Sequence, residues 1–318
     1  MNLQIRAKTI GGRWLSLNDP ISMDYQASRF IPCDSLEVTL LAQHQNENFC
    51  ELAASLDNFV FFEGIVDKQT LSFSNKGNLL MINCRNKTAW LVDNEVKPYI
   101  YFQLTSSELF KQYALPFGVL SHEFPYEAKK NFIQVKKGMS NWNVIEEFCR
   151  LVYQKTPYIN QDRKLVLNPI NNSIHTLSNH HSSATLFSSL QIKRLNYKLI
   201  SRLFLKTATE TYGYFYGVVL ENENAKQKQV KRDRYYHSSN KLSASAKAEA
   251  EQIIKESNRN SYLVSVTVPL LMSARVGDQV KLYHDAISQG NLVIIGMRYI
   301  INEKGLQTQL DLADKQYI

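Results

Sequence analysis

The sequence lacks any long hydrophobic run. No apolar stretch approaches the roughly 20 residues that would span a bilayer. The first six residues already alternate like a β-strand, and they contain no apolar core of the kind that a signal peptide has. We therefore expect the protein to fold in a cytoplasm, and we expect no membrane insertion by this chain.

Cysteine is scarce, and its spacing excludes two further classes of protein. The four cysteines, Cys33, Cys50, Cys84 and Cys149, are widely separated, and no two of them form a C-x-x-C pair. A disulfide-rich secreted domain or a structural zinc site needs closely spaced cysteines. The pattern predicts buried free thiols in a reducing compartment.

The motifs of common enzyme classes are also absent. The sequence contains no phosphate-binding G-x-x-x-x-G-K-[ST] loop, no dinucleotide-binding G-x-G-x-x-G, no G-x-S-x-G and no H-E-x-x-H. His175 with the adjacent His180 and His181 is the nearest approach to a metal site, but no carboxylate or thiol stands at a supporting spacing. Glu146 and Glu147 would diverge by about 100° on a helix, so they cannot share a site. We predict no catalytic, metal-binding or cofactor-binding residue and no cofactor, which favours a structural or assembly protein over an enzyme.

Charge is mostly dispersed. The net charge of +8 comes from 37 basic and 29 acidic residues, and one dense run, predicted to be a solvated loop, holds Lys226, Lys228, Lys231, Arg232 and Arg234. A basic protein with aromatic residues on one strand face can bind single-stranded nucleic acid, and Tyr212, Tyr214 and Tyr216 would share such a face. Nucleic-acid binding by small β-barrels is therefore one alternative, although we expect no specific nucleic-acid binding.

Two segments at opposite ends of the chain read alike. Each is an apolar strand with one internal glycine, followed by a turn ending in glycine and a second strand. The first contains Gly64 and the second contains Gly296. A glycine inside a strand marks a bulge or a sharp bend, so we expect both residues to be structural corners of two related β-barrels.

The patterns along the whole chain predict an α+β fold that is predominantly β. Residues 1–98 predict a first antiparallel β-barrel domain. Residues 99–187 predict an inserted mixed α+β domain, with helices beginning at a Thr105–Glu108 capping box and at Ser140, and with a polar linker at its end. Residues 188–318 predict a second β-barrel domain, interrupted by a helix at about 243–257.

The order of these segments resembles a known family. The residues that carry the likeness are Gly12-Arg13-Trp14, the hairpin at 62–67, the Trp-containing helix at 140–149, Val268-Pro269, residues 276–280 and the closing Gly296 hairpin. In this order they resemble the baseplate hub family of contractile phage tails and phage-like particles, which includes the Mu-like tail hubs and the late-control D proteins. The chain departs from the family at 153–157, where a Gly-rich turn is common.

The resemblance implies a geometric function without catalysis. Two related barrels per chain would form a trimeric ring with pseudo-six-fold symmetry, which joins a six-fold tail tube to a three-fold central spike. The implied partners are two further copies of the chain, a tail tube protein, a central spike protein, and tape-measure and other baseplate proteins. The chain would be made in the bacterial cytoplasm and assembled into a tail baseplate. The basic run at 226–234 would face the channel or a neighbouring subunit. Because no repetitive β-helix follows residue 318, we expect the spike to be a separate polypeptide. A tail-associated hydrolase that cuts cell wall is the other alternative, and it would need a carboxylate pair or a metal site.

Overall fold

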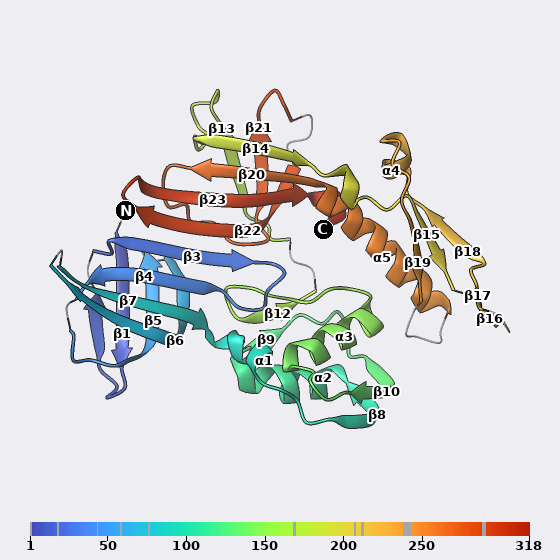
Figure 1. The fold of residues 1–318 in the computed structure, drawn as a ribbon, viewed down its shortest axis with the longest axis horizontal. Coiled ribbons are helices and arrows are strands. Elements are labelled where there is room, and N and C mark those ends of the chain that lie inside the picture. Colours follow the sequence, from blue (N-terminus) through green and yellow to red (C-terminus); the bar gives the residue numbers. More distant parts are fainter. Residues whose placement is uncertain are drawn as a thin grey trace.

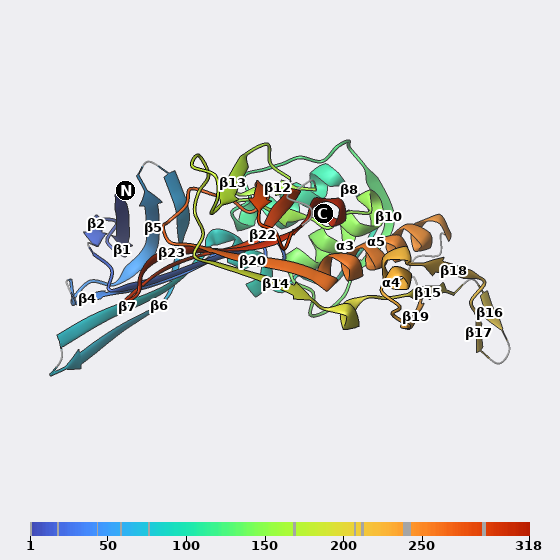
Figure 2. The same ribbon diagram turned by 90° about the horizontal axis from the view of Figure 1, so that it is seen from above.

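The computed structural model describes residues 2–17, 19–42, 44–57, 59–75, 77–167, 170–206, 208–210, 213–237, 243–287 and 291–318. The fold is predominantly β with a smaller helical content, as expected (Figure 1). In the described part of the chain, no helix is long and apolar enough to cross a membrane. Figure 2 shows the molecule as elongated, with the β6–β7 hairpin projecting at one end and the β16–β17 hairpin at the other.

The N-terminal third is an antiparallel β-unit. Its strand order is β3-β4-β7-β6-β5-β1-β2. The sequence predicted most of these strands, because apolar and polar residues alternate and one face of each strand is buried. It gave no indication of β3 and β5. The strands are β1 (Leu3–Thr9), β2 (Trp14–Leu17), β3 (Ser22–Ser28), β4 (Ser35–Leu41), β5 (Phe49–Leu56), β6 (Phe59–Ser74) and β7 (Gly77–Asn86).

A second β-unit is built from the C-terminal part of the chain. Its strands are β13 (Ile174–Ser178), β14 (Ser189–Arg194), β20 (Tyr262–Val268), β21 (Gln279–Tyr283), β22 (Asn291–Asn302) and β23 (Gly305–Asp314). The polar stretch predicted to be a linker contains β13, so that prediction is wrong. Strand β13 pairs in parallel with β21 over five residues, and Leu177 is its fully buried apolar anchor.

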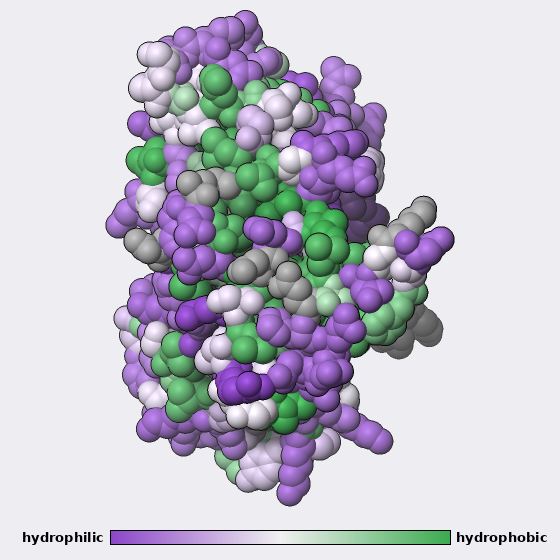
Figure 3. Space-filling model, turned by 90° about the vertical axis from the view of Figure 1, so that its left-hand side faces the viewer, coloured by the Kyte–Doolittle hydropathy of each residue, from purple (hydrophilic) through white to green (hydrophobic). Residues whose placement is uncertain are grey.

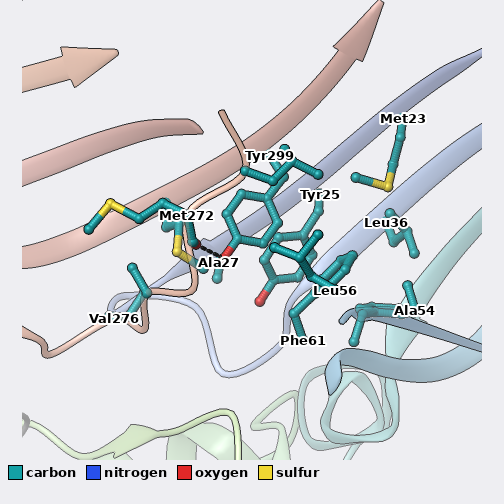
Figure 4. Close-up of a cluster of buried hydrophobic side chains, with 14 of the residues drawn as sticks. Met23, Tyr25, Ala27, Leu36, Ala54, Leu56, Phe61, Met272, Val276 and Tyr299 are labelled. Atoms are coloured by element: carbon teal, nitrogen blue, oxygen red, sulfur yellow. Dashed lines mark hydrogen bonds between the residues drawn. The ribbon is translucent and has the colours of Figure 1, made fainter. Parts of the chain in front are cut away.

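The two β-units form one continuous sheet of 13 strands. Strand β3 pairs with β22 over six residues, from Ser28 opposite Gly296 to Met23 opposite Ile301. The buried apolar side chains of both units belong to one core. Figure 4 shows this core at the junction, where Tyr25 from β3 and Tyr299 from β22 lie against Phe61 from β6. The two halves are thus joined by backbone pairing as well as by apolar packing.

A mixed unit with its own core is inserted after β7. It follows two short helical turns, η1 (Lys87–Ala89) and α1 (Trp90–Asp93). Its helix α3 (Asn141–Tyr153) begins at a Ser140 capping box, as predicted, and buries Trp142, Ile145 and Phe148. The other elements are β8 (Tyr99–Thr105), α2 (Ser106–Leu109), the π-turn η2 (Phe110–Ala114), η3 (Leu115–Phe117), β9 (Ser121–His122), β10 (Lys129–Val135), β11 (Tyr158–Ile159) and β12 (Lys164–Val166). The predicted Thr105–Glu108 capping box is present at the start of α2.

A second insertion lies between β14 and β20. Strands predicted to belong to the β-barrel form a separate three-stranded sheet of order β18-β15-β19, which packs on α5 through Leu203, Leu205 and Ala250. Helix α5 runs four residues further than predicted. The elements are η4 (Asn196–Lys198), β15 (Arg202–Leu205), β16 (Ala208–Glu210), β17 (Gly213–Phe215), β18 (Val218–Glu221), α4 (Glu223–Gln227), β19 (Asp233–Tyr236) and α5 (Ser243–Ser261); the chain ends in η5 (Lys315–Tyr317).

Candidate assembly surfaces

Gly64 and Gly296 both lie beside β-bulges, but their surroundings differ. The register of β6 against β7 shifts between Val66 and Lys68, and that of β22 against β23 shifts between Ile294 and Gly296. A Cβ atom on Gly64 would stand 2.3 Å from the carbonyl oxygen of Arg85, which no side chain can tolerate. A Cβ atom on Gly296 would be 3.4 Å from the nearest atoms of Asp311. Of these two glycines, Gly64 is the one at which the β7 backbone comes so close that any residue with a Cβ atom would clash.

The β11–β12 turn of the inserted unit binds both halves of the sheet. The Gln161 side-chain amide donates a hydrogen bond of 2.9 Å to the Tyr25 hydroxyl in β3. Arg275, from the second β-unit, donates to both oxygens of Asp162 at 2.8 and 3.0 Å. The neighbouring Arg163 lies 3.8 Å from Glu63 of β6. These contacts fix the inserted unit against the junction, so the β-units and the insertion form one body.

Asp34 sits at the same junction and is a proton-sensitive group. The Tyr25 hydroxyl donates to its carboxylate at 3.0 Å. Burial raises the pKa of Asp34 to about 7, against the opposing effect of this hydrogen bond. The folded protein therefore holds a proton on Asp34 at pH values where the unfolded chain, with an ordinary pKa of about 4, has released it. Stability is lost as the pH rises from about 4 to about 7.

Replacing Asp34 with asparagine tests this linkage. We expect the Asp34→Asn variant to match the unsubstituted protein near pH 4 and to become more stable than it as the pH rises, by about 1–2 kcal/mol at pH 8. The full pKa shift would correspond to a larger difference in unfolding free energy. We expect a smaller one because Asp34 is partly exposed to solvent, which screens the effect. Urea unfolding at several pH values measures the difference. A difference that is constant with pH, or that grows as the pH falls, would contradict the assignment.

The outer face of the joined sheet is polar and hollowed. A cavity of 590 Å³ opens where β14, β20, β23, β22, β3 and β4 lie side by side. Uncharged polar side chains make up a large part of its lining: Gln26, Ser28, Ser35, Ser189, Gln191, Ser265, Thr267 and Gln309. Gly296 belongs to the same lining, and Arg298 and Asp24 form an ion pair across β22 and β3 at its edge. The polar lining favours water and polar ligand groups over a tightly bound apolar ligand.

One end of the sheet carries exposed apolar side chains from both halves. This apolar rim consists of Ile21, Leu41, Phe73, Leu79 and Leu306, all of which are exposed. They lie at the hairpin ends of neighbouring strands, since Leu41 is opposite Leu79 and the β22–β23 turn adjoins β3. Figure 3 looks at this end, the left side of Figure 1, and shows apolar surface gathered across it. An apolar area that spans several elements marks an interaction surface.

The basic run predicted to be a loop contains two regular elements. Lys226 lies in α4 and Arg234 in β19, with Lys228, Lys231 and Arg232 between them. The Arg232 guanidinium donates to the Tyr197 carbonyl oxygen, while the other four side chains are exposed. The run therefore lies on the surface of the second insertion.

The aromatic face predicted for nucleic-acid stacking differs from the one observed. Tyr212 and the side chain of Tyr214 lie outside the described residues. Tyr216 instead packs edge-on against Tyr235, whose ring stacks on Phe204 at 5.0 Å. The rings therefore contact one another and do not form the row on one strand face that was predicted.

The histidine candidates for a metal site do not converge. His175 lies in β13 and is 2.9 Å from the buried carboxylate of Asp278, which also accepts hydrogen bonds from Asn171 and from the backbone of Arg275. His180 and His181 follow in a turn held by the Ser178 hydroxyl. Among the described residues no group of three or more His, Cys, Asp or Glu side chains could hold a metal ion. The four cysteines are free, and Cys84 and Cys149 are buried.

The whole fold is similar to that of solved phage tail proteins and of tail-like proteins of type VI secretion. The tail protein from Neisseria meningitidis MC58 matches with a TM-score of 0.80 at 15% identity, over 100% of this chain and 98% of that one. The 43 kDa tail protein of prophage MuSo2 from Shewanella oneidensis matches with a TM-score of 0.78 at 13% identity, over 99% of each chain.

A more distant solved structure has a similar fold. A component of the E. coli type VI secretion system, described as structurally similar to the T4 bacteriophage tail proteins gp27 and gp5, has a TM-score of 0.61 at 8% identity, over 100% of this chain and 78% of that one. No protein-family model matches the sequence, and no curated protein matches it. At these identities the likeness lies in the fold, and it agrees with the resemblance found in the sequence.

Proposed function

We propose that this protein is the baseplate hub of a contractile tail or tail-like particle. In this proposal three copies form a ring with pseudo-six-fold symmetry, which joins the six-fold tail tube to a three-fold central spike. The observation that carries the proposal is the continuous sheet, in which two β-units, each with a bulged hairpin, lie side by side through β3 and β22. The role is geometric and requires no catalytic residue.

The apolar rim supports a stacking contact with the tube. Phe73 and Leu79 come from the hairpin of one half, and Leu306 comes from the corresponding hairpin of the other. Each chain thus presents two apolar hairpin ends at one end of the molecule, and three chains would present six. A ring of six tube subunits could then meet one hairpin end each. We further propose that Lys226, Lys228, Lys231, Arg232 and Arg234 face the channel or a neighbouring subunit.

The oligomeric state tests the ring. Native mass spectrometry of the purified protein, alone and with a candidate spike protein of the same particle, is expected to show three copies in the complex. Electron microscopy of that complex should show an annulus with near-six-fold density on one side. A chain that remains monomeric with its spike and tube partners would overturn the proposal.

Substitution of the rim tests which surface makes the tube contact. We expect the double variant Phe73→Ser, Leu306→Ser to unfold within about 0.5 kcal/mol of the unsubstituted protein, because both side chains are already exposed. Tails carrying it are expected to assemble at least about tenfold less often, since apolar anchors dominate such contacts. Sedimentation of tail particles from cells measures this. Leu115→Ser, at an exposed apolar residue in η3 of the inserted unit, is the matched control, and equal assembly with both variants would exclude the rim.

A further inference from the structure

The inserted unit carries a second apolar surface, far from the rim. Strands β8 and β10 form a two-stranded ribbon whose outer edges are unpaired within the described part of the chain. Figure 1 shows the ribbon at the lower margin of the molecule. On its outer face Phe102 is 75% exposed and Phe132 is 72% exposed, with the two ring centroids 5.8 Å apart. Ile100 is exposed beside them, whereas Ile133 and Val135 on the inner face are buried. The buried side chains of the inner face hold the ribbon against the core of the inserted unit. The stability of the fold therefore does not require the two exposed rings.

The backbone of Phe132 is strained. Its φ is +56°, a left-handed conformation, although it lies within β10. For a bulky residue this conformation is rare and costs of order 1–3 kcal/mol. The register places Asn131 opposite Gln103 and Ile133 opposite Tyr101, so Phe132 faces Phe102. Glycine would adopt the same backbone without strain, yet a large aromatic residue stands here, fully presented to solvent.

Charge indicates the chemistry of the partner. The two insertions, residues 99–167 and 196–261, hold 21 Lys and Arg against 13 Asp and Glu, whereas the rest of the chain holds 16 against 16. The net charge of +8 therefore lies on the insertions, with +3 on the first insertion, which carries the ribbon, and +5 on the second. Lys129, Lys136 and Lys137 are exposed at the two ends of β10, so an apolar centre is flanked by positive charge. An acidic segment with apolar side chains complements this surface.

Among the described residues, the N-terminal β-unit of a second copy has few acidic side chains that are not already in ion pairs. The β-units are neutral overall, and the acidic side chains of the N-terminal unit are largely engaged within the same molecule. Ion pairs join Asp24 to Arg298, Glu47 to Arg13, Glu51 to Lys8, and both Asp67 and Asp93 to Arg85. The complementary charge must come from a different protein.

We propose that the β8–β10 ribbon is a docking site for an acidic, strand-forming segment of another protein. The segment adds to an open edge of the ribbon through backbone hydrogen bonds, its apolar side chains cover Phe102 and Phe132, and its carboxylates face the lysines. The site is separate from the apolar rim, and it stands whether or not the chain forms a hub ring.

A defined peptide tests the site on the full-length protein. The probe is a fluorescent peptide of about eight residues that alternates glutamate with valine or phenylalanine, and the comparison probe carries lysine in place of glutamate. Fluorescence anisotropy is expected to show saturable binding of the glutamate peptide, weakened by salt, and at least about tenfold weaker binding of the lysine peptide. Equal binding of both peptides, or no binding of the glutamate peptide, would overturn the proposal. Displacement of the peptide by single-stranded DNA would assign the surface to nucleic acid instead.

Four variants separate recognition from folding. Phe132→Gly relieves the backbone strain, so its thermal midpoint is expected to be equal to or higher than that of the unsubstituted protein, while its affinity for the glutamate peptide falls at least about tenfold. Phe102→Ser should lose a similar factor, and Phe215→Ser, at an exposed aromatic residue in β17, should lose none. Lys136→Glu with Lys137→Glu should weaken binding and reduce its dependence on salt. Unchanged affinity in Phe132→Gly and Phe102→Ser would show that the ribbon is not the site.

Discussion

Replacing Gly64 with alanine is expected to unfold the protein or to cost at least about 3 kcal/mol of unfolding free energy. The added Cβ would stand 2.3 Å from the Arg85 carbonyl oxygen and 2.5 Å from the Phe62 ring. The backbone of β7 would have to retreat from β6, and the bulge that follows at Val66 and Lys68 would lose its support. Urea unfolding followed by circular dichroism measures the loss, and solubility on expression gives an early indication.

Gly296→Ala is the matched control for that prediction. It lies at the corresponding position of the other hairpin, but its nearest new contacts are ordinary side-chain atoms of Asp311 at 3.4 Å. We expect a loss of no more than about 1 kcal/mol, because the Asp311 side chain can move by a few tenths of an ångström. Equal losses in the two variants would show that the glycines are needed for strand bending alone and not for the close approach at Gly64.

Tyr299→Ala is expected to cost about 4 kcal/mol. The ring is fully buried and lies 5.4 Å from Tyr25 and 5.2 Å from Phe61, so its loss leaves a cavity where the two halves of the sheet meet. Tyr25 is its direct cross-strand partner between β3 and β22. The effect should concentrate at that pairing. Hydrogen exchange of the β3 and β22 amides is expected to accelerate more than exchange in α3, which lies in a separate core.

Tyr299→Phe separates packing from hydrogen bonding. The hydroxyl donates to the Met272 carbonyl oxygen, as the dashed line in Figure 4 shows. Its removal is expected to cost about 1–2 kcal/mol, since the carbonyl is left without this donor. If Tyr299→Ala and Tyr299→Phe were equally destabilised, the aromatic packing across the junction would contribute little.

Local sequence patterns predicted the elements whose burial alternates clearly. The helix at Asn141–Tyr153 was evident because Trp142, Ile145 and Phe148 recur at helical spacing behind a polar cap. Strand β13 was missed because only Leu177 of its apolar residues is buried, and its neighbours are Asn, Ser and His residues that are typical of loops. The separate sheet of β15, β18 and β19 was also missed, because alternation of apolar and polar residues predicts a strand but does not indicate the sheet to which the strand belongs.

The surfaces were harder to predict than the elements. The pairing of β3 with β22 joins residues that are 274 positions apart, such as Asp24 and Arg298, and no local pattern encodes such a partner. The apolar rim gathers single residues from five separate segments, each unremarkable in its own context. The conformation of Phe132 has no sequence signal either, since Phe in a strand normally indicates an ordinary extended residue. Only the three-dimensional arrangement brings these features together.

The pairing of β3 with β22 also has a consequence for biosynthesis. At about 5–20 residues per second, the ribosome finishes β22 roughly 15–55 s after β3. Throughout that interval β3 has a free edge on one side, and a nascent chain with such an edge can pair with the wrong strand. A truncated product never closes the sheet. Only a chain that includes the last hairpin can therefore close the sheet. Any assembly that needs the closed sheet would be built only from full-length copies.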